Sequence, residues 1–333
     1  MLFSQAALGE RHVGTGEYRG MEFFHVNART IVNKVPVASA MPFRYTINAY
    51  RGCSHACTYC FARPSHAYLG LGTGEDFERR IVVKINAVER LRAELRSARW
   101  QGDRIAMGTN TDPYQKAEGK YHLTQGIVRV LAEAGNSFSI ATKSTLVLRD
   151  LPVLAQAAAR TRVRLDISVG TLEREVWQLT EPGTPPPDKR LEAVRRLNEA
   201  GVRCGVLIAP ILPGLSDSDD QLRAVAEACL QAGAVSVTPV ALHLRPGVRE
   251  HYLEWLGRMR PDLVALYAER FPRGSYQSRA EQQRVAEIVR AVEESAGRRY
   301  SKRRHTGCGP PRRPSPQASA VRVRASNEQL RLL

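Results

Sequence analysis

The sequence lacks long apolar runs and is poor in cysteine and in acidic residues. No uninterrupted apolar segment approaches the ~20 residues needed to cross a bilayer, so we do not expect a membrane protein. Residues 1–20 contain no basic segment followed by a long apolar one, which argues against secretion and predicts a cytoplasmic protein. Six cysteines among 333 residues are too few for a disulfide scaffold, and their clustering indicates metal or redox chemistry instead.

The basic residues are unevenly distributed. The chain has 49 Lys and Arg against 33 Asp and Glu, which gives a net charge of +16. Residues 298–333 contain ten of these basic residues and a single acid, Glu328, and therefore carry +9. Their Arg-, Pro- and Ser-rich composition is typical of a disordered extension. Two interpretations stay open, namely a solvated tail and a tail that binds nucleic-acid phosphates.

Short β-prone segments alternate with helical patterns through most of the chain. The predicted strands are residues 45–50, 104–108, 137–142, 163–169, 202–209 and 234–240. Alternation of strand and crossover helix gives parallel strands that are buried on both faces. Six such units predict an α/β fold, either an incomplete (β/α) barrel or an open doubly wound sheet. Neither GxGxxG after the first strand nor GxxxxGK[ST] occurs, so nucleotide binding of these two kinds loses its main support.

Helical periodicity supports this alternation. It predicts helices over residues 123–134, 188–200 and 216–229. Gly201 suits a left-handed cap after the second helix, and Ser216 and Asp217 suit the start of the third. Three further helical patterns, at residues 249–259, 261–271 and 278–297, are expected to cover the open side of the sheet.

Three cysteines follow the first predicted strand. Cys53, Cys57 and Cys60 have the spacing C-x3-C-x2-C, which lets one loop surround a metal centre. A structural zinc site needs four protein ligands, and His55 or His66 could supply the fourth. A [4Fe–4S] cluster held by three cysteines leaves one iron free for an external ligand. The ligand count and the position after a strand favour the cluster.

The cysteine motif, C-x3-C-x-Tyr-C after the first strand of a six-unit pattern, resembles that of the radical S-adenosylmethionine (radical SAM) superfamily. Segments 48–63, 108–118, 140–154, 167–173 and 207–219 resemble its branch related to spore photoproduct lyase, a DNA repair enzyme. The resemblance implies a partial (β/α)6 barrel that binds a [4Fe–4S] cluster and S-adenosylmethionine. It also implies an electron donor such as flavodoxin or ferredoxin. The expected organisation is an N-terminal extension (1–42), a core barrel (43–245), a helical segment (246–297) and the basic tail (298–333).

The resemblance also implies which residues bind the cofactor. Tyr59 is expected near the adenine, and Lys143 is expected to pair with the cofactor carboxylate. Barrel sites form at the carboxyl ends of the strands, and the remaining cofactor candidates lie there: Thr109, Asn110 and Thr111 for the amine, Ser168 for the ribose or carboxylate, and Ala209 for the adenine. Weaker candidates are Arg190, which we expect to be solvated at the start of a helix, and three residues that could meet substrate, Tyr114, His243 and Arg245.

Two positions depart from spore photoproduct lyase. Those enzymes have Tyr after the last cluster cysteine and Cys in the loop after the second strand, whereas this chain has Phe61 and Thr109. In the lyase this Tyr and Cys return a hydrogen atom to the product. The sequence therefore predicts a radical SAM enzyme of unknown substrate, a nucleic acid being one candidate, that is not a spore photoproduct lyase. The alternatives are a basic nucleic-acid-binding protein with a Cys3His zinc site, and a radical enzyme acting on a protein or small molecule.

Overall fold

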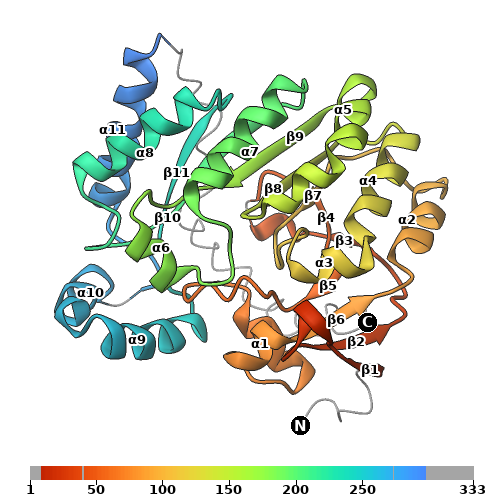
Figure 1. Cartoon of the computed structure of the whole chain (residues 1–333), viewed down its shortest axis with the longest axis horizontal. Helices are drawn as coiled ribbons and strands as arrows, with labels where there is room; N and C mark the ends of the chain where they lie inside the picture. Colours follow the sequence, from red (N-terminus) through yellow and green to blue (C-terminus); the bar gives the residue numbers. More distant parts are fainter. Residues whose placement is uncertain (1–8, 40, 273, 298–333) are drawn as a thin grey trace, which may run out of the picture.

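A computed structural model of the chain (Figure 1) describes residues 9–39, 41–272 and 274–297. The predicted basic tail, residues 298–333, lies outside the described residues. None of the helices within the described ranges is both long and apolar enough to span a bilayer.

The centre of the fold is a seven-stranded sheet of order β11-β10-β9-β8-β7-β4-β3. Six strands are parallel and follow one another in sequence order across the sheet, with β5 (Tyr50–Arg51) and β6 (Arg80–Lys84) of another sheet intervening in the chain between β4 and β7; β3 adds an antiparallel edge. The strands are β3 (Val32–Lys34), β4 (Tyr45–Ile47), β7 (Ile105–Met107), β8 (Phe138–Thr142), β9 (Val163–Ser168), β10 (Cys204–Ile211) and β11 (Val237–Ala241). All six predicted strands are present, and their sequential parallel order is that of an incomplete (β/α) barrel.

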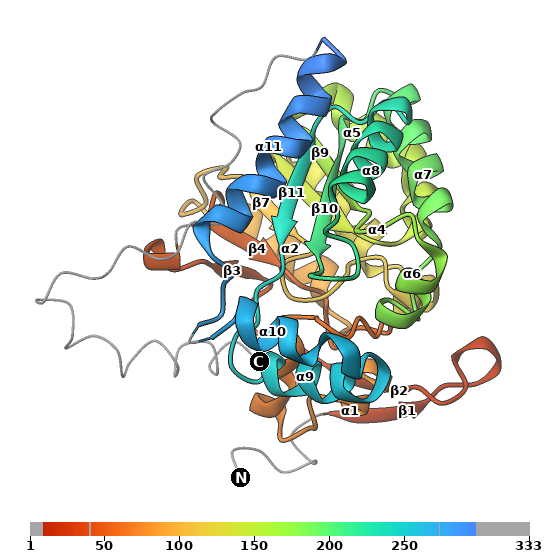
Figure 2. The same cartoon turned by 90° about the vertical axis from the view of Figure 1, so that its left-hand side faces the viewer.

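Helices connect successive strands and cover one face of the sheet (Figures 1 and 2). They are α2 (Ala87–Leu95), α4 (Leu123–Glu133), α5 (Leu151–Arg160), α7 (Pro187–Glu199) and α8 (Asp219–Gln231), with the 3-10 helix η5 (Thr145–Asp150) before α5. Two shorter helices, α3 (Lys116–Tyr121) and α6 (Arg174–Thr180), lie in the connections at the carboxyl ends of the strands (Figures 1 and 2). Apolar side chains from both layers form the core, such as Ile140, Leu165 and Val206 of the strands with Leu131 and Leu154 of the helices, all at most 1% exposed. The apolar residues that recur with a period of 3.6 in the sequence thus form the buried faces of these helices.

A second sheet, of order β1-β2-β6-β5, was not expected from the sequence. Its strands are β1 (Glu10–Val13), β2 (Glu22–Val26), β5 (Tyr50–Arg51) and β6 (Arg80–Lys84). Two short elements, η4 (Arg63–Leu69) and α1 (Glu75–Arg79), precede β6. The predicted strand 45–50 is therefore two strands, of which β4 belongs to the parallel sheet and β5 to this one. The second sheet flanks the loop that carries the three cysteines, because that loop leaves β5 directly.

The helix caps are partly as predicted. Gly201 has a φ of 77° after α7, as expected for a left-handed cap. The prediction of Ser216 and Asp217 as caps of α8 is wrong, because the Ser218 hydroxyl accepts from the Gln221 backbone N–H. The Ser216 and Asp217 side chains instead accept from the backbone N–H groups of Leu212 and Gly214, in the turn before the helix.

Only one of the C-terminal helices covers the open side of the sheet. Helix α11 (Arg279–Ser295) lies along β11 (Figure 2), and Oε1 of Glu293 accepts a hydrogen bond from the Val237 backbone N–H at 3.1 Å. Helices α9 (Val248–Met259) and α10 (Val264–Arg270), joined by η6 (Pro261–Leu263), lie beyond the carboxyl ends of β10 and β11. They pack on Leu212 and on the cysteine loop at Tyr59, so the prediction that they cover the sheet is wrong.

Candidate active site

The loop with Cys53, Cys57 and Cys60 begins directly after β5, near the carboxyl ends of the parallel strands. Gly52 enters it with a φ of 81°, and a Cβ there would lie 2.8 Å from the Phe77 carbonyl oxygen. The Cys53 backbone N–H donates to the same carbonyl at 2.9 Å. Only glycine fits this turn, because it tolerates both the positive φ and the close approach.

A buried arginine holds the loop from behind. The side chain of Arg63 is 0% exposed, and its Nε and Nη2 donate to the Cys57 carbonyl at 3.1 and 2.9 Å. Its Nη1 donates to the Thr73 carbonyl, and its guanidinium pairs with Glu78 at 2.5 Å. Because these hydrogen bonds go to the backbone carbonyl of Cys57 and not to its thiol, they hold the loop in place whether or not the thiols bind a metal.

Cys53 and Cys57 are buried, Cys60 is partly buried, and the three thiols are close enough to interact electrostatically. Burial raises the pKa of Cys53 well above its ordinary value, and the Asp112 carboxylate adds to the effect. Burial raises the pKa of Cys57 to about 12, although the charge of Lys143 opposes it. Burial likewise raises the pKa of Cys60. Thiols in such surroundings ionise only when a cation binds them, because metal coordination replaces the proton. The loop therefore has the donor atoms and the environment for an iron–sulfur cluster.

The turn after β7 packs against the cysteine loop. Gly108 has a φ of 86°, and a Cβ there would lie 1.9 Å from the Ala141 carbonyl oxygen of β8, so only glycine fits. The Thr111 hydroxyl and Nε2 of Gln115 donate to the Gly52 carbonyl at 2.6 and 2.8 Å. Thr111, a predicted cofactor residue, thus has a partner inside the chain and helps to position the cysteine loop.

Asp112 joins this turn to the end of β8. Its carboxylate accepts from the Thr142 hydroxyl at 2.6 Å and from the Lys143 backbone N–H at 2.8 Å, and it lies 3.3 Å from Nδ1 of His55. Burial raises the pKa of Asp112, but His55 and these donors outweigh burial and hold the pKa below its ordinary value. The carboxylate stays charged and fixes the cysteine loop relative to two strand ends.

A buried network centred on Glu181 surrounds Tyr59. The Tyr59 hydroxyl donates to Oε1 of Glu181, and Nζ of Lys143 lies 4.0 Å from the same oxygen. The Arg190 guanidinium pairs with Oε2 of Glu181 and donates to the Ser168 carbonyl. Arg190 is only 1% exposed, so the expectation of a solvated helix-start arginine is wrong. The structure thus brings together three predicted cofactor residues, Tyr59, Lys143 and Ser168, around an acid that the sequence analysis missed.

A cavity of about 580 Å³ lies beside the cysteine loop. Its wall includes Phe61, directly after Cys60, and the predicted cofactor residues Thr109 and Asn110 from the turn after β7. Phe61 and Thr109 are the two positions at which the sequence comparison predicted a departure from spore photoproduct lyase, and both line this cavity. Arg245 also lines the cavity.

The remaining sequence candidates, His243, Tyr114 and Ala209, are not among the residues that line this cavity. The ring of His243 contacts those of Phe61 and Tyr276, at centroid distances of 5.8 Å. Tyr114 is 1% exposed in the core between strands and helices, away from the cavity wall. Ala209 lies in β10, immediately before a cis peptide bond to Pro210.

The geometry does not form a single-ion site. In tetrahedral zinc sites Zn–S bonds of about 2.3 Å place sulfurs about 3.8 Å apart. Among the described residues, the only group of three or more Cys, His, Asp or Glu ligand atoms within 4.8 Å of one another is Glu10, His12 and His25. The three thiols are spread more widely. His66 shares Nε2 with the Arg80 carbonyl at 2.9 Å, and its Nδ1 has no hydrogen-bond partner among the described residues. The wide spacing suits a multinuclear cluster better than Cys3His zinc.

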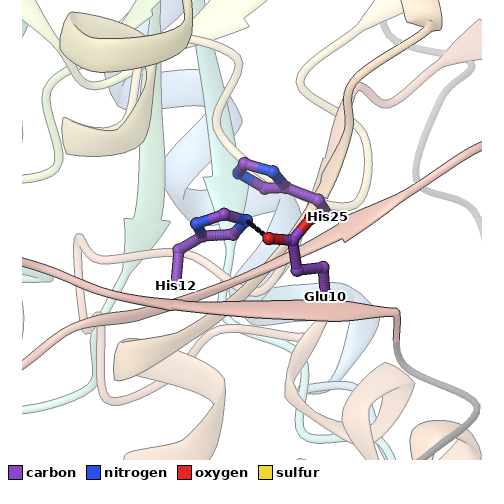
Figure 3. A group of neighbouring side chains, drawn as sticks. All are labelled: Glu10, His12 and His25. Atoms are coloured by element: carbon purple, nitrogen blue, oxygen red, sulfur yellow. Dashed lines mark ion pairs between the residues drawn. The ribbon is translucent and has the colours of Figure 1, made fainter.

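The group Glu10, His12 and His25 lies on strands β1 and β2 (Figure 3). His12 pairs with Glu10 at 3.3 Å, and the two imidazole rings stack with centroids 3.8 Å apart. Nε2 of His25 shares a hydrogen bond of 2.8 Å with the Tyr121 hydroxyl. Because the rings face each other and one nitrogen is already occupied, this group is a surface contact of the strand pair.

Comparisons with known proteins agree with this geometry. The model of the radical SAM superfamily matches residues 47–226, and the chain belongs to that superfamily. An uncharacterized protein of Mycobacterium tuberculosis (strain H37Rv) is 42% identical over 95% of this chain and 91% of its own length. An uncharacterized protein of Methanocaldococcus jannaschii is 29% identical over 59% of this chain and 70% of its own.

Solved structures show the same fold. Spore photoproduct lyase complexed with dinucleoside spore photoproduct matches with a TM-score of 0.58 and 19% identity, over 82% of this chain and 79% of the lyase chain. A variant of that lyase with bound AdoMet and the same dinucleoside matches with a TM-score of 0.59 and 18% identity, over the same shares. The expected fold and the resemblance to this branch are confirmed.

Proposed function

We propose that the chain is a radical SAM enzyme that holds a [4Fe–4S] cluster on Cys53, Cys57 and Cys60 and cleaves S-adenosylmethionine reductively. The observation that carries the proposal is the set of three thiols in one loop at the carboxyl ends of a parallel sheet, with Cys53 and Cys57 buried and Cys60 partly buried. When both are bound, the reduced cluster and S-adenosylmethionine supply a 5′-deoxyadenosyl radical that abstracts a hydrogen atom from substrate. Flavodoxin or ferredoxin is the proposed electron donor, in the cytoplasm.

The residues of the chain bind and orient the cofactor. Lys143 supplies a positive charge for the cofactor carboxylate, and the Tyr59 ring lies beside it, with Nζ 5.6 Å from the ring centroid. Ser168 and Ala209 follow on the next strands, as hydrogen-bond and backbone partners of the ribose and adenine. Thr109 and Asn110 line the cavity nearby and are proposed for the amine. Thr111 acts through the Gly52 carbonyl and positions the cysteine loop.

The proposed substrate is a nucleic acid, but not spore photoproduct. The net charge of +16 favours a polyanion, and the similar lyase structures hold a dinucleoside photoproduct. Phe61 and Thr109 line the cavity where that lyase branch carries Tyr and Cys, and neither a phenyl ring nor a threonine hydroxyl readily donates a hydrogen atom. We therefore propose a different reaction outcome on a nucleic-acid substrate.

The test is anaerobic reconstitution of the full chain, followed by metal analysis and a cofactor cleavage assay. We expect about four irons and four sulfides per chain and formation of 5′-deoxyadenosine after reduction. Replacement of Cys53, Cys57 or Cys60 with Ala should abolish both. Cys229→Ala is the matched control, because Cys229 is fully buried in the helical layer away from the loop and should keep both properties. Stoichiometric zinc instead of iron, or full cleavage by a cluster-cysteine variant, would contradict the proposal.

A further inference from the structure

A buried lysine without a partner lines the cavity beside the cysteine loop. Lys84 is the last residue of β6 and is only 2% exposed. Among the described residues, no side chain or carbonyl forms a hydrogen bond or ion pair with its ammonium group. Burial of an uncompensated charge costs free energy. A buried lysine without a partner therefore either loses its proton or binds an anion.

Arg51 lies next to Lys84 on the same face of the second sheet. In the antiparallel β5–β6 pair Arg51 stands opposite Val82, and Lys84 is two residues further along, which makes the two side chains diagonal neighbours. Burial, followed by the charge of Arg51, lowers the pKa of Lys84 to about 8, so the amine is still mostly protonated at neutral pH. Two partly desolvated cations therefore share one corner of the cavity.

No acid of the cavity wall neutralises these cations. The described lining residues include four basic side chains, Lys34, Arg51, Lys84 and Arg245, and no Asp or Glu. The one carboxylate that raises the pKa of Lys84 is Glu94, whose two oxygens accept from the backbone N–H groups of Ile31 and Val32 at 2.8 and 2.9 Å. The described wall of the cavity therefore carries a net positive charge, which an anionic ligand would neutralise.

Two further groups in the wall also lack partners. Oδ1 of Asn48 and Oγ of Ser65 are buried and form no hydrogen bond with any described residue. Phe61 and Tyr68 line the same cavity and are 46% and 47% exposed, which is unusual for large aromatic side chains. Buried polar atoms are normally satisfied, and exposed aromatic faces in a basic groove are the surfaces on which bases stack.

From this arrangement we propose that Lys84 and Arg51 form a phosphate-binding subsite for the substrate, and that the cavity takes a nucleotide unit whose base packs on Phe61 or Tyr68. The inference rests on the radical SAM function proposed above and specifies how its substrate is held. The proposed cofactor carboxylate partner Lys143 does not line this cavity, and neither do Tyr59 and Ser168, whereas Thr109 and Asn110, which are proposed for the cofactor amine, form part of its wall. The subsite is therefore adjacent to the proposed cofactor site and uses different cations. A phosphate seated here holds the nucleotide next to Phe61, one residue after the cluster ligand Cys60.

The binding test uses reconstituted full-length protein and the dinucleotide thymidylyl-thymidine as probe, measured by calorimetry. Lys84→Gln and Arg51→Gln should each weaken binding at least about tenfold, because each removes a charge-assisted hydrogen bond to the phosphate. Lys189→Gln is the matched control, since Lys189 is exposed on α7 and its loss changes the net charge equally. It should alter binding less than about twofold. Equal binding by the Lys84 and Lys189 variants, or no binding by the wild type, would overturn the subsite.

A second variant keeps the test informative if the glutamine variants fold poorly. Lys84→Met removes the buried charge and keeps the side-chain length, so it should raise the melting temperature in the absence of anions. Inorganic phosphate should stabilise the wild type and leave Lys84→Met unchanged. Equal stabilisation of the two proteins by phosphate would contradict the proposal. Iron and sulfide content, measured on the same samples, reports separately on the cluster, so a failure of the proposed function is distinguishable from a failure of the subsite.

Further probes identify the source of the phosphate. A methylphosphonate-linked thymidine dinucleotide lacks the charge and should bind to the wild type as weakly as thymidylyl-thymidine binds to Lys84→Gln. Glucose 6-phosphate has a phosphate but no base and should bind more weakly than the dinucleotide. Equal or tighter binding of the sugar phosphate would overturn the nucleotide assignment. If Lys84→Gln weakens binding of S-adenosylmethionine and not of the dinucleotide, the anion is the cofactor carboxylate and the proposal is wrong.

Discussion

Glu181 and Arg190 form a buried ion pair between the residue that follows α6 and the first turn of α7. Oε2 of Glu181 accepts from Nη2 of Arg190, and the two residues are 4% and 1% exposed. The other carboxylate oxygen accepts from the Tyr59 hydroxyl. A single acid therefore connects the cysteine loop to the helix layer.

Replacing Glu181 with Gln should destabilise the protein strongly. The change leaves the Arg190 guanidinium buried without its counter-charge, and breaking a buried pair in this way costs about 3–5 kcal/mol. Chemical unfolding of the cluster-free protein, followed by circular dichroism, measures the loss. Glu192→Gln is the control, because it removes an exposed ion pair with Arg195 on α7 and should change the free energy of unfolding by less than about 0.5 kcal/mol. A similar decrease in the free energy of unfolding in both variants would show that the buried Glu181–Arg190 pair contributes no more stability than the exposed pair.

The same pair gives a pH dependence with a definite sign. Burial raises the pKa of Glu181, but Arg190 and Lys143 outweigh burial and hold it below its ordinary value of 4.5. A carboxyl with a lowered folded-state pKa stabilises the protein above its ordinary value, and that stability is lost as the pH falls through the folded pKa. The stability difference between wild type and Glu181→Gln should therefore be constant above pH 4.5 and shrink below it. A difference that grows on acidification would contradict this assignment.

Gly108→Ala should be much more damaging than Gly201→Ala. Both glycines have a positive φ, 86° and 77°, so both substitutions cost about 1–2 kcal/mol of backbone strain. At Gly108 the new Cβ would also lie 1.9 Å from the Ala141 carbonyl oxygen, whereas a Cβ at Gly201 would have no atom of another described segment within 4 Å. We expect at least about 2 kcal/mol of additional destabilisation for Gly108→Ala, measured by chemical unfolding. Equal destabilisation by the two substitutions would mean that β7 and β8 can move apart to accommodate the Cβ without a loss of stability.

Given spore photoproduct dinucleoside and a reductant, the enzyme should cleave S-adenosylmethionine without efficient recovery of thymine. The reason is the absence of the lyase's Cys and Tyr, whose positions are occupied by Thr109 and Phe61 in the cavity wall. Chromatography of thymine products and of 5′-deoxyadenosine measures the two outcomes. Thr109→Cys returns a thiol to the cavity and should raise any recovery of thymine. Repair over multiple turnovers by the wild type would show that another hydrogen donor, such as Tyr59, substitutes.

Deletion of residues 298–333 should weaken nucleic-acid binding similarly for all sequences. This segment carries +9 of the net charge, and contacts to phosphates release counterions without reading bases. The slope of log affinity against log salt should flatten by about 0.7–0.9 per lost phosphate contact. Cofactor cleavage should survive, because no proposed cluster or cofactor residue lies beyond Ala209. An unchanged slope after truncation would remove the tail from the argument for a nucleic-acid partner.

The parallel sheet could be predicted from the sequence, because its strands and helices have local apolar patterns and follow one another in order. Strand β6 could not, since its partners β2 and β5 lie in other parts of the sequence and its last residue, Lys84, is charged. The sequence also did not show that Arg190 is buried, because the fold of the connection between α6 and α7 is what brings Glu181 onto its guanidinium. At α8 the sequence offers Ser216, Asp217 and Ser218 as caps, and only the turn before the helix decides among them.

The contact between Glu293 and Val237 protects the edge strand β11 from pairing with a second copy of the protein. β11 is the last strand of the large sheet, and an edge strand offers free backbone amides on which a foreign strand can pair. The Glu293 carboxylate occupies the amide of Val237, and α11 lies along the same edge. Loss of α11 would therefore expose a template for intermolecular β-pairing, and truncated chains that end before residue 279 should aggregate even where their barrel is intact.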